Sequence, residues 1–119
     1  MIHSLDTNII LYFLSDRLLQ PLPDGEYAIS VITEIELLSY PRLNKQAEKQ
    51  IRDFLTQLTI IELEPAVKEL AIQLRKQHSL RLPDAIIAAT AMSVESKLLS
   101  NDQQFLKIPR LHCVQLPLK

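Results

Sequence analysis

Residues 82–91 read Leu82-Pro83-Asp84-Ala85-Ile86-Ile87-Ala88-Ala89-Thr90-Ala91, and the segment from Asp84 to Glu95 is apolar on nearly every side of a helical wheel. A helix of this kind is buried on most of its surface. We therefore predict a helix in the middle of the fold. Pro83-Asp84 is typical of a helix start, and a carboxylate that borders an apolar core usually needs a partner.

Short apolar segments suited to strands alternate with helical segments on either side of this helix. The expected strands are Ile2–Leu5, Tyr27–Ile32, Thr59–Leu63, Leu98–Leu99 and His112–Leu116. The expected helices are Ile9–Leu14, a short helix that Thr33 starts and Pro41 stops, Asn44–Leu58, a helix that begins near Pro65, and a short helix through Phe105. This alternation predicts an α/β fold, a three-layer sandwich with a central, mainly parallel sheet.

The composition fits one domain over residues 1–119. With 47% hydrophobic residues and a mean hydropathy of +0.06, the chain is apolar for so small a domain, and we expect part of its surface to form an interface. Its net charge of −1 means that any contact with nucleic acid must be local. The single cysteine, Cys113, excludes an intramolecular disulfide and fits a reducing cytoplasm.

No membrane segment is expected. The longest nearly apolar run, Ala85 to Met92, is far shorter than the roughly 20 residues that cross a bilayer. The first six residues contain no basic stretch followed by an apolar core, so they do not form a signal peptide.

Four acidic residues are candidates for one site. Asp6 and Asp102 follow predicted strands, Glu36 lies one turn into the helix after the second strand, and Asp84 begins the central helix. In open parallel sheets, functional groups collect at the carboxyl ends of the strands. If these ends converge, the four carboxylates share one crevice and repel one another unless a polyvalent cation neutralises them. Mg²⁺ and Mn²⁺ prefer such oxygen ligands, so this pattern predicts a metal site.

Each acid also has a structural interpretation. Asp6 can cap the first helix, and Asp84 can simply start the central one. Thr33 and Glu36 match a capping box, and Asn101-Asp102 can be only a turn. Helical periodicity does not decide between Glu34 and Glu36 as the functional acid.

Four motifs together resemble the PIN-domain family, most closely the short VapC-type ribonucleases that are toxins of bacterial toxin–antitoxin pairs. The motifs are Leu5-Asp6-Thr7-Asn8-Ile9-Ile10-Leu11, Ile32-Thr33-Glu34-Ile35-Glu36-Leu37, the segment Leu82 to Ala91, and Leu99-Ser100-Asn101-Asp102-Gln103-Gln104-Phe105. In the family the acid just before the leucine of the second motif is the functional one, which favours Glu36. The resemblance covers nearly the whole chain.

The resemblance implies a ribonuclease that hydrolyses RNA phosphodiester bonds with Mg²⁺ or Mn²⁺ held by the four acids. It also implies a homodimer and an antitoxin partner. Neutral hydrogen-bonding residues that could orient the carboxylates are Thr7, Asn8, Thr33, Ser100 and Asn101, although each also suits a turn or a cap. One departure concerns Gln104, because some family members carry a further acid beside the aromatic residue of the fourth motif.

Two groups of basic residues are candidates for RNA binding. One consists of Lys45, Lys49 and Arg52 at helical spacing, and the other of Arg75, Lys76, His78 and Arg81 just before Asp84. Arg75, Lys76 and Arg81 are better placed, although a charged run is often only a solvated face.

The sequence argues against two other classes of function and leaves one alternative to the nuclease. A receiver-like phosphoacceptor domain needs a second acid beside Asp6, which is missing, and one glycine, Gly25, cannot supply a glycine-rich phosphate loop. A catalytically weak PIN-fold module that binds RNA or protein remains the alternative, and cation-dependent cleavage would separate it from the nuclease.

Overall fold

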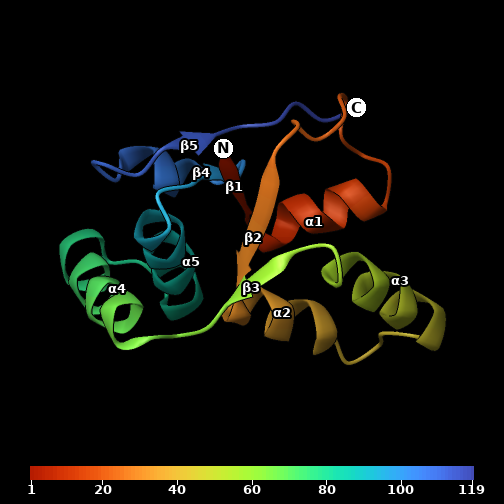
Figure 1. Cartoon of the computed structure of the whole chain (residues 1–119), viewed down its shortest axis with the longest axis horizontal. Helices are drawn as coiled ribbons and strands as arrows, with labels where there is room; N and C mark the ends of the chain where they lie inside the picture. The colour runs from red at the N-terminus through yellow and green to blue at the C-terminus, as the bar shows by residue number, and fades with distance from the viewer.

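The computed structural model describes residues 1–119 and contains a five-stranded parallel sheet between two layers of helices (Figure 1). The strands are β1 (Ile2–Leu5), β2 (Glu26–Ser30), β3 (Thr59–Ile61), β4 (Lys97–Leu99) and β5 (Cys113–Val114). Their order across the sheet is β3-β2-β1-β4-β5, which puts β1 in the centre. The predicted α/β sandwich is confirmed.

The helices are α1 (Thr7–Leu14), α2 (Val31–Leu38), α3 (Lys45–Leu55), α4 (Pro65–His78) and α5 (Leu82–Ser93), followed by a 3-10 helix, η1 (Gln103–Lys107). Figure 1 shows α4 and α5 on one side of the sheet and α1 and α3 on the other. Each side has its own core, and neighbouring residues of β4 supply both of them. Leu98 belongs to the core around α5, and Leu99 to the core around α1. This is the alternation expected of a strand buried on both faces.

The central helix is α5, as its sequence predicts. Every residue from Asp84 to Ala91 is buried, and the helix packs against α4, α2 and β2. It begins at Leu82, with Pro83 in its first turn, where a missing backbone N–H costs nothing. Asp84 consequently lies inside the first turn.

The predicted boundary between β2 and α2 is wrong. The strand ends at Ser30, whose side chain accepts a hydrogen bond from the N–H of Ile32 and caps α2. Val31 and Ile32 are therefore helical, and Thr33 is not the cap of a capping box. A serine cap outweighs the strand preference of two β-branched residues.

The two edge strands are shorter than predicted, since β3 ends at Ile61 and β5 covers only Cys113 and Val114. Each has a neighbour on one side only.

The longest helix, α4, has 14 residues, and none of the helices combines the length and apolar character that a membrane crossing requires.

Candidate active site

The four predicted acids lie around the carboxyl end of the central strand. Asp6 directly follows β1, and Asp102 lies three residues after the end of β4, which pairs with β1. Glu36 is on α2, which follows β2, the other neighbour of β1. Asp84 lies in the first turn of α5. The parallel topology thus brings together residues that are far apart in the sequence, as predicted.

Ser100 connects the first acid with the fourth. Its hydroxyl donates to Oδ2 of Asp6 at 2.7 Å and accepts from the backbone N–H of Asp102 at 3.1 Å. The other oxygen of Asp6, Oδ1, accepts from the backbone N–H of Thr7 at 2.8 Å. Asp6 is therefore both the cap of α1 and a member of the acidic group, so its two interpretations are compatible.

Thr7 connects the first motif with the second. Its hydroxyl donates to Oε1 of Glu36 at 2.7 Å and lies 3.2 Å from the hydroxyl oxygen of Thr33. Both threonines are buried. This contact bonds Glu36 to the residue that follows Asp6, and it gives a structural reason to prefer Glu36 to Glu34.

Asp84 has two donors on one oxygen. Arg81 Nε lies 3.1 Å from Oδ2 of Asp84, and Gln104 Nε2 lies 3.0 Å from the same oxygen. Gln104 Nε2 also donates to Oδ2 of Asp102 at 2.8 Å. One amide nitrogen therefore joins the third acid to the fourth.

The environment of Asp6 makes its carboxyl harder to ionise than that of an exposed aspartate. Burial raises the pKa of Asp6 above its ordinary value, the hydrogen bonds from Ser100 and Thr7 oppose that rise, and the charges of Asp84 and Asp102 add to it. At the mouth of the site, the pKa of Arg81 is raised by its hydrogen bond and charge interaction with Asp84, with smaller contributions from Glu36 and Asp102. Excess negative charge thus surrounds Asp6.

The oxygen ligands of the acidic group suit a hard divalent cation chemically, but their side chains do not form a complete coordination site. Four carboxylates and the hydroxyls of Thr7 and Ser100 are oxygen ligands of the kind that Mg²⁺ and Mn²⁺ bind, and like charges that raise the pKa of Asp6 are what a cation would neutralise. As the side chains lie here, no three acidic, histidine or cysteine residues are close enough to enclose a metal ion.

Two of the five predicted orienting residues, Thr7 and Ser100, bond acids directly, whereas Thr33 contacts only the hydroxyl of Thr7. Asn8 is exposed, and no hydrogen bond joins its side chain to an acid. Asn101 instead bonds both backbone polar groups of Leu116 and holds the C-terminal segment. The sequence marks Gln104 only as a position where some family members carry an acid. Its place in the fourth motif is the one feature that could have indicated its contacts with Asp84 and Asp102.

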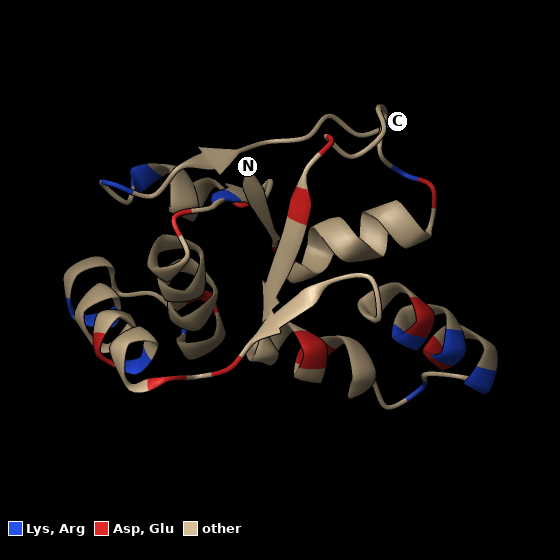
Figure 2. Cartoon of the chain, in the orientation of Figure 1, with Lys and Arg blue, Asp and Glu red and all other residues tan.

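Two of the three basic residues of α3 are paired with acids of the same helix. Lys49 lies 2.8 Å from Asp53, and Arg52 lies 3.0 Å from Glu48. Figure 2 shows this mixture of charge along α3. In the other group Arg75 donates to the carbonyl of Leu80, Lys76 is exposed, and Arg81 reaches Asp84.

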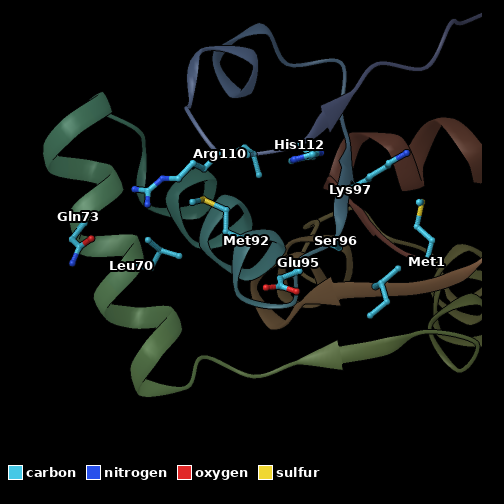
Figure 3. Close-up of a pocket in the computed structure, with 11 residues that line it drawn as sticks. Met1, Leu70, Gln73, Met92, Glu95, Ser96, Lys97, Arg110 and His112 are labelled. Atoms are coloured by element: carbon cyan, nitrogen blue, oxygen red, sulfur yellow. The ribbon is translucent and has the colours of Figure 1, made fainter.

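A cavity of about 790 Å³ lies elsewhere. It includes the start of β1, the end of α5 and the segment before β5, and Figure 3 shows Leu70 and Gln73 of α4 beside it. None of the four acids lines this cavity. The candidate active site is the acidic group, because that is where like charges, a raised pKa and shared hydrogen bonds coincide.

Comparisons with known proteins identify the family of the chain. The family model of the PIN domain matches residues 4–111. A toxin–antitoxin complex from Klebsiella pneumoniae contains a chain with 31% sequence identity and a TM-score of 0.79, with 94% of this chain and 95% of that chain covered. VapBC2 from Rickettsia felis, bound to a promoter DNA fragment, has 24% identity and a TM-score of 0.82, with 98% and 100% covered.

VapBC-1 from nontypeable Haemophilus influenzae has 25% identity and a TM-score of 0.76, with 97% of this chain and 98% of that chain covered. No functionally curated protein matches the chain at a significant level. The family model alone spans most of the sequence, including all four acids. The chain belongs to the PIN-domain family.

Proposed function

We propose that this protein is a divalent-metal-dependent ribonuclease and the toxin of a toxin–antitoxin pair. The observation that carries the proposal is the arrangement of Asp6, Asp84 and Asp102, with Glu36 tied to Asp6 through Thr7, at the carboxyl end of β1 in a PIN domain. The 31% identical chain in the Klebsiella pneumoniae toxin–antitoxin complex supports the toxin assignment.

Asp6, Glu36, Asp84 and Asp102 would hold Mg²⁺ or Mn²⁺. Bound there, the cation would activate water for attack on a phosphodiester and stabilise the charge that develops on the phosphoryl oxygens. Ser100 and Thr7 fix the orientations of Asp6 and Glu36, so these carboxylates need little reorganisation. Burial of Asp6 and Asp84 restricts water around the site.

Arg81, Lys76 and Arg75 would contact the RNA backbone. Arg81 is the most direct candidate, because its side chain is 80% exposed while its Nε lies 3.1 Å from Asp84. A guanidinium at that position can bind a phosphate as it approaches the acids. Arg75 is less free, since it donates to the carbonyl of Leu80.

An antitoxin and a second copy of the chain are the proposed protein partners, and the proposed location is the cytoplasm. The similar solved structures are described as toxin–antitoxin or VapBC complexes. Exposed large hydrophobic side chains give an interface the apolar surface that it needs, and they include Leu19, Ile35, Tyr40, Leu63 and Leu82.

A catalytically weak PIN-fold module that binds RNA or protein is the second candidate. It is favoured by the hydrogen bonds that Asp84 already receives from Arg81 and Gln104, and because no three of the acids are close enough to enclose a metal ion. Such a module would bind RNA through Arg81 and its neighbours without cutting it.

The test is incubation of purified protein with labelled single-stranded and structured RNAs in Mg²⁺, Mn²⁺ or EDTA. We expect cleavage that requires the cation and disappears in Asp6→Asn. Asp24→Asn is the matched control, because Asp24 is an exposed acid of the loop before β2. This variant should cut RNA like the wild type. Intact RNA in every reaction, with metal binding measured separately, would favour the binding module.

A further inference from the structure

Gln104 occupies a special position between two of the acids. Its Nε2 lies 3.0 Å from Oδ2 of Asp84 and 2.8 Å from Oδ2 of Asp102. An amide NH₂ group has two hydrogens, so one nitrogen can donate to both carboxylates at once. The two bonds join the first turn of α5 to the segment that follows β4.

The backbone holds Gln104 in this place. Its own N–H donates to Oδ1 of Asp102 at 3.1 Å, so Asp102 is bonded twice to the same residue. The next residue, Phe105, is fully buried in the core around α5 and anchors η1. The bridge is therefore part of a fixed turn rather than the end of a free side chain.

Two carboxylates held this close to one nitrogen repel each other. The amide offsets part of that repulsion with the partial positive charge of its hydrogens, but it carries no net charge and leaves the site negative. A divalent cation would seek the same two oxygens, Oδ2 of Asp84 and Oδ2 of Asp102. The amide and the cation are thus competitors for them.

We propose that Gln104 is a positioning residue that holds Asp84 and Asp102 together in the metal-free protein and lowers the affinity of the site for divalent cations. This inference rests on the proposed function, because it concerns the same acids. It implies that the cation must break both side-chain hydrogen bonds of Gln104 before it can use all four carboxylates.

The experiment compares Gln104→Met, which keeps the length of the side chain and removes the donors, with Gln104→Glu, which adds a carboxylate. Gln103→Met and Gln103→Glu are the matched controls, because Gln103 is exposed and makes no hydrogen bond to an acid. Mn²⁺ affinity is measured by calorimetry, and the melting temperature is measured in EDTA and in Mn²⁺.

We expect both Gln104 variants to melt at a lower temperature than the wild type in EDTA, and to bind Mn²⁺ more tightly. The gain should be about 10-fold for Gln104→Met, the effect of removing the competing hydrogen bonds, and larger for Gln104→Glu. The gain in melting temperature on adding Mn²⁺ should be larger than in the wild type. The Gln103 variants should match the wild type in all three measurements.

A residue that only stabilises η1 would give a different result. Its loss would lower the melting temperature equally in EDTA and in Mn²⁺ and leave the Mn²⁺ affinity unchanged, and that outcome, or weaker binding by Gln104→Met, would overturn the proposal. Failure of the proposed function is distinguishable. If the wild type neither binds Mn²⁺ nor cuts RNA while Gln104→Met binds Mn²⁺, Gln104 has the proposed role and the wild-type protein is not a metal-dependent nuclease.

Discussion

The hydroxyl of Ser100 lies 2.7 Å from Oδ2 of Asp6, although the two residues are 94 positions apart in the chain. The bond opposes the effects that raise the pKa of Asp6, which are burial and the charges of Asp84 and Asp102. It is possible only because β1 and β4 are paired in parallel, so that both chains leave the sheet at the same edge.

Ser100→Ala should raise the pKa of Asp6 further and lower the free energy of unfolding at pH 7 by about 1–3 kcal/mol, because a buried carboxylate loses a donor. Urea denaturation in EDTA measures the second effect, and NMR titration of the Asp6 carboxyl measures the first. Ser15→Ala is the control, since the Ser15 hydroxyl bonds an exposed backbone carbonyl of α1. Equal losses in the two variants would contradict a specific role of Ser100.

Thr7→Val should leave the fold intact and reduce Mn²⁺ affinity and RNA cleavage by roughly 10-fold or more, the usual effect of removing a group that orients a metal ligand. Valine has the shape of threonine but cannot donate to Glu36. Thr7→Ser should restore much of the loss. Thr56→Val removes an exposed hydroxyl that bonds only the carbonyl of Asp53, and it should behave like the wild type.

Cys113 should react slowly with iodoacetamide. Burial, followed by the charges of Asp6 and Asp102, raises the pKa of its thiol to about 11, so roughly one molecule in a thousand carries the thiolate at pH 8. Asp102→Asn should speed the reaction by removing one of these charges, whereas Asp24→Asn should not. The rate is followed by mass spectrometry of the folded protein. If the two variants react alike, the acidic group does not act on Cys113.

His3 should make stability fall in mild acid. Burial, then the charges of Lys97 and the N-terminus, lower the pKa of His3 below its ordinary value of 6.5. The unfolded chain therefore binds a proton that the folded protein resists, so the free energy of unfolding is highest above pH 6.5 and decreases as the pH falls through that value.

The variant His3→Phe tests this pH dependence, because phenylalanine can still stack on Tyr27, whose ring centre lies 5.2 Å from that of His3. It also removes Nδ1 of His3, a buried atom without a hydrogen-bond partner. Urea denaturation between pH 5 and 7.5 should show a flatter profile than the wild type. A profile as steep as before would mean that another group causes the acid sensitivity.

Three of the acids can be located from the sequence, because Asp6 and Asp102 follow strands, Asp84 begins a helix, and parallel strands end at one edge. Glu36 lies inside α2, and in the sequence only the family resemblance favours it over Glu34. Sequence reasoning could also identify α5, because a helix that is apolar on every side has no other stable position. It could not set the end of β2, since Val31 and Ile32 suit a strand and only the cap at Ser30 makes them helical.

Contacts between side chains were the least predictable part. The sequence predicts Asn101 as a partner of the acids, but its amide forms hydrogen bonds with the backbone of Leu116. Leu116 is 15 positions further along the chain, and no local pattern in the sequence predicts this contact. Gln104 likewise reaches Asp84 only because η1 folds back beside α5. Such contacts depend on which rotamers the packed core allows, and a linear pattern does not contain that information.

The central position of β1 has a consequence for the order in which the protein is made. Asp6 is synthesised first, but Ser100 and Asp102 emerge only when the chain is nearly finished, and β4 must be in place before they can reach Asp6. A growing chain therefore has an incomplete site for most of its synthesis. If the protein is the proposed ribonuclease, this delay would protect the messenger RNA that the ribosome is still translating.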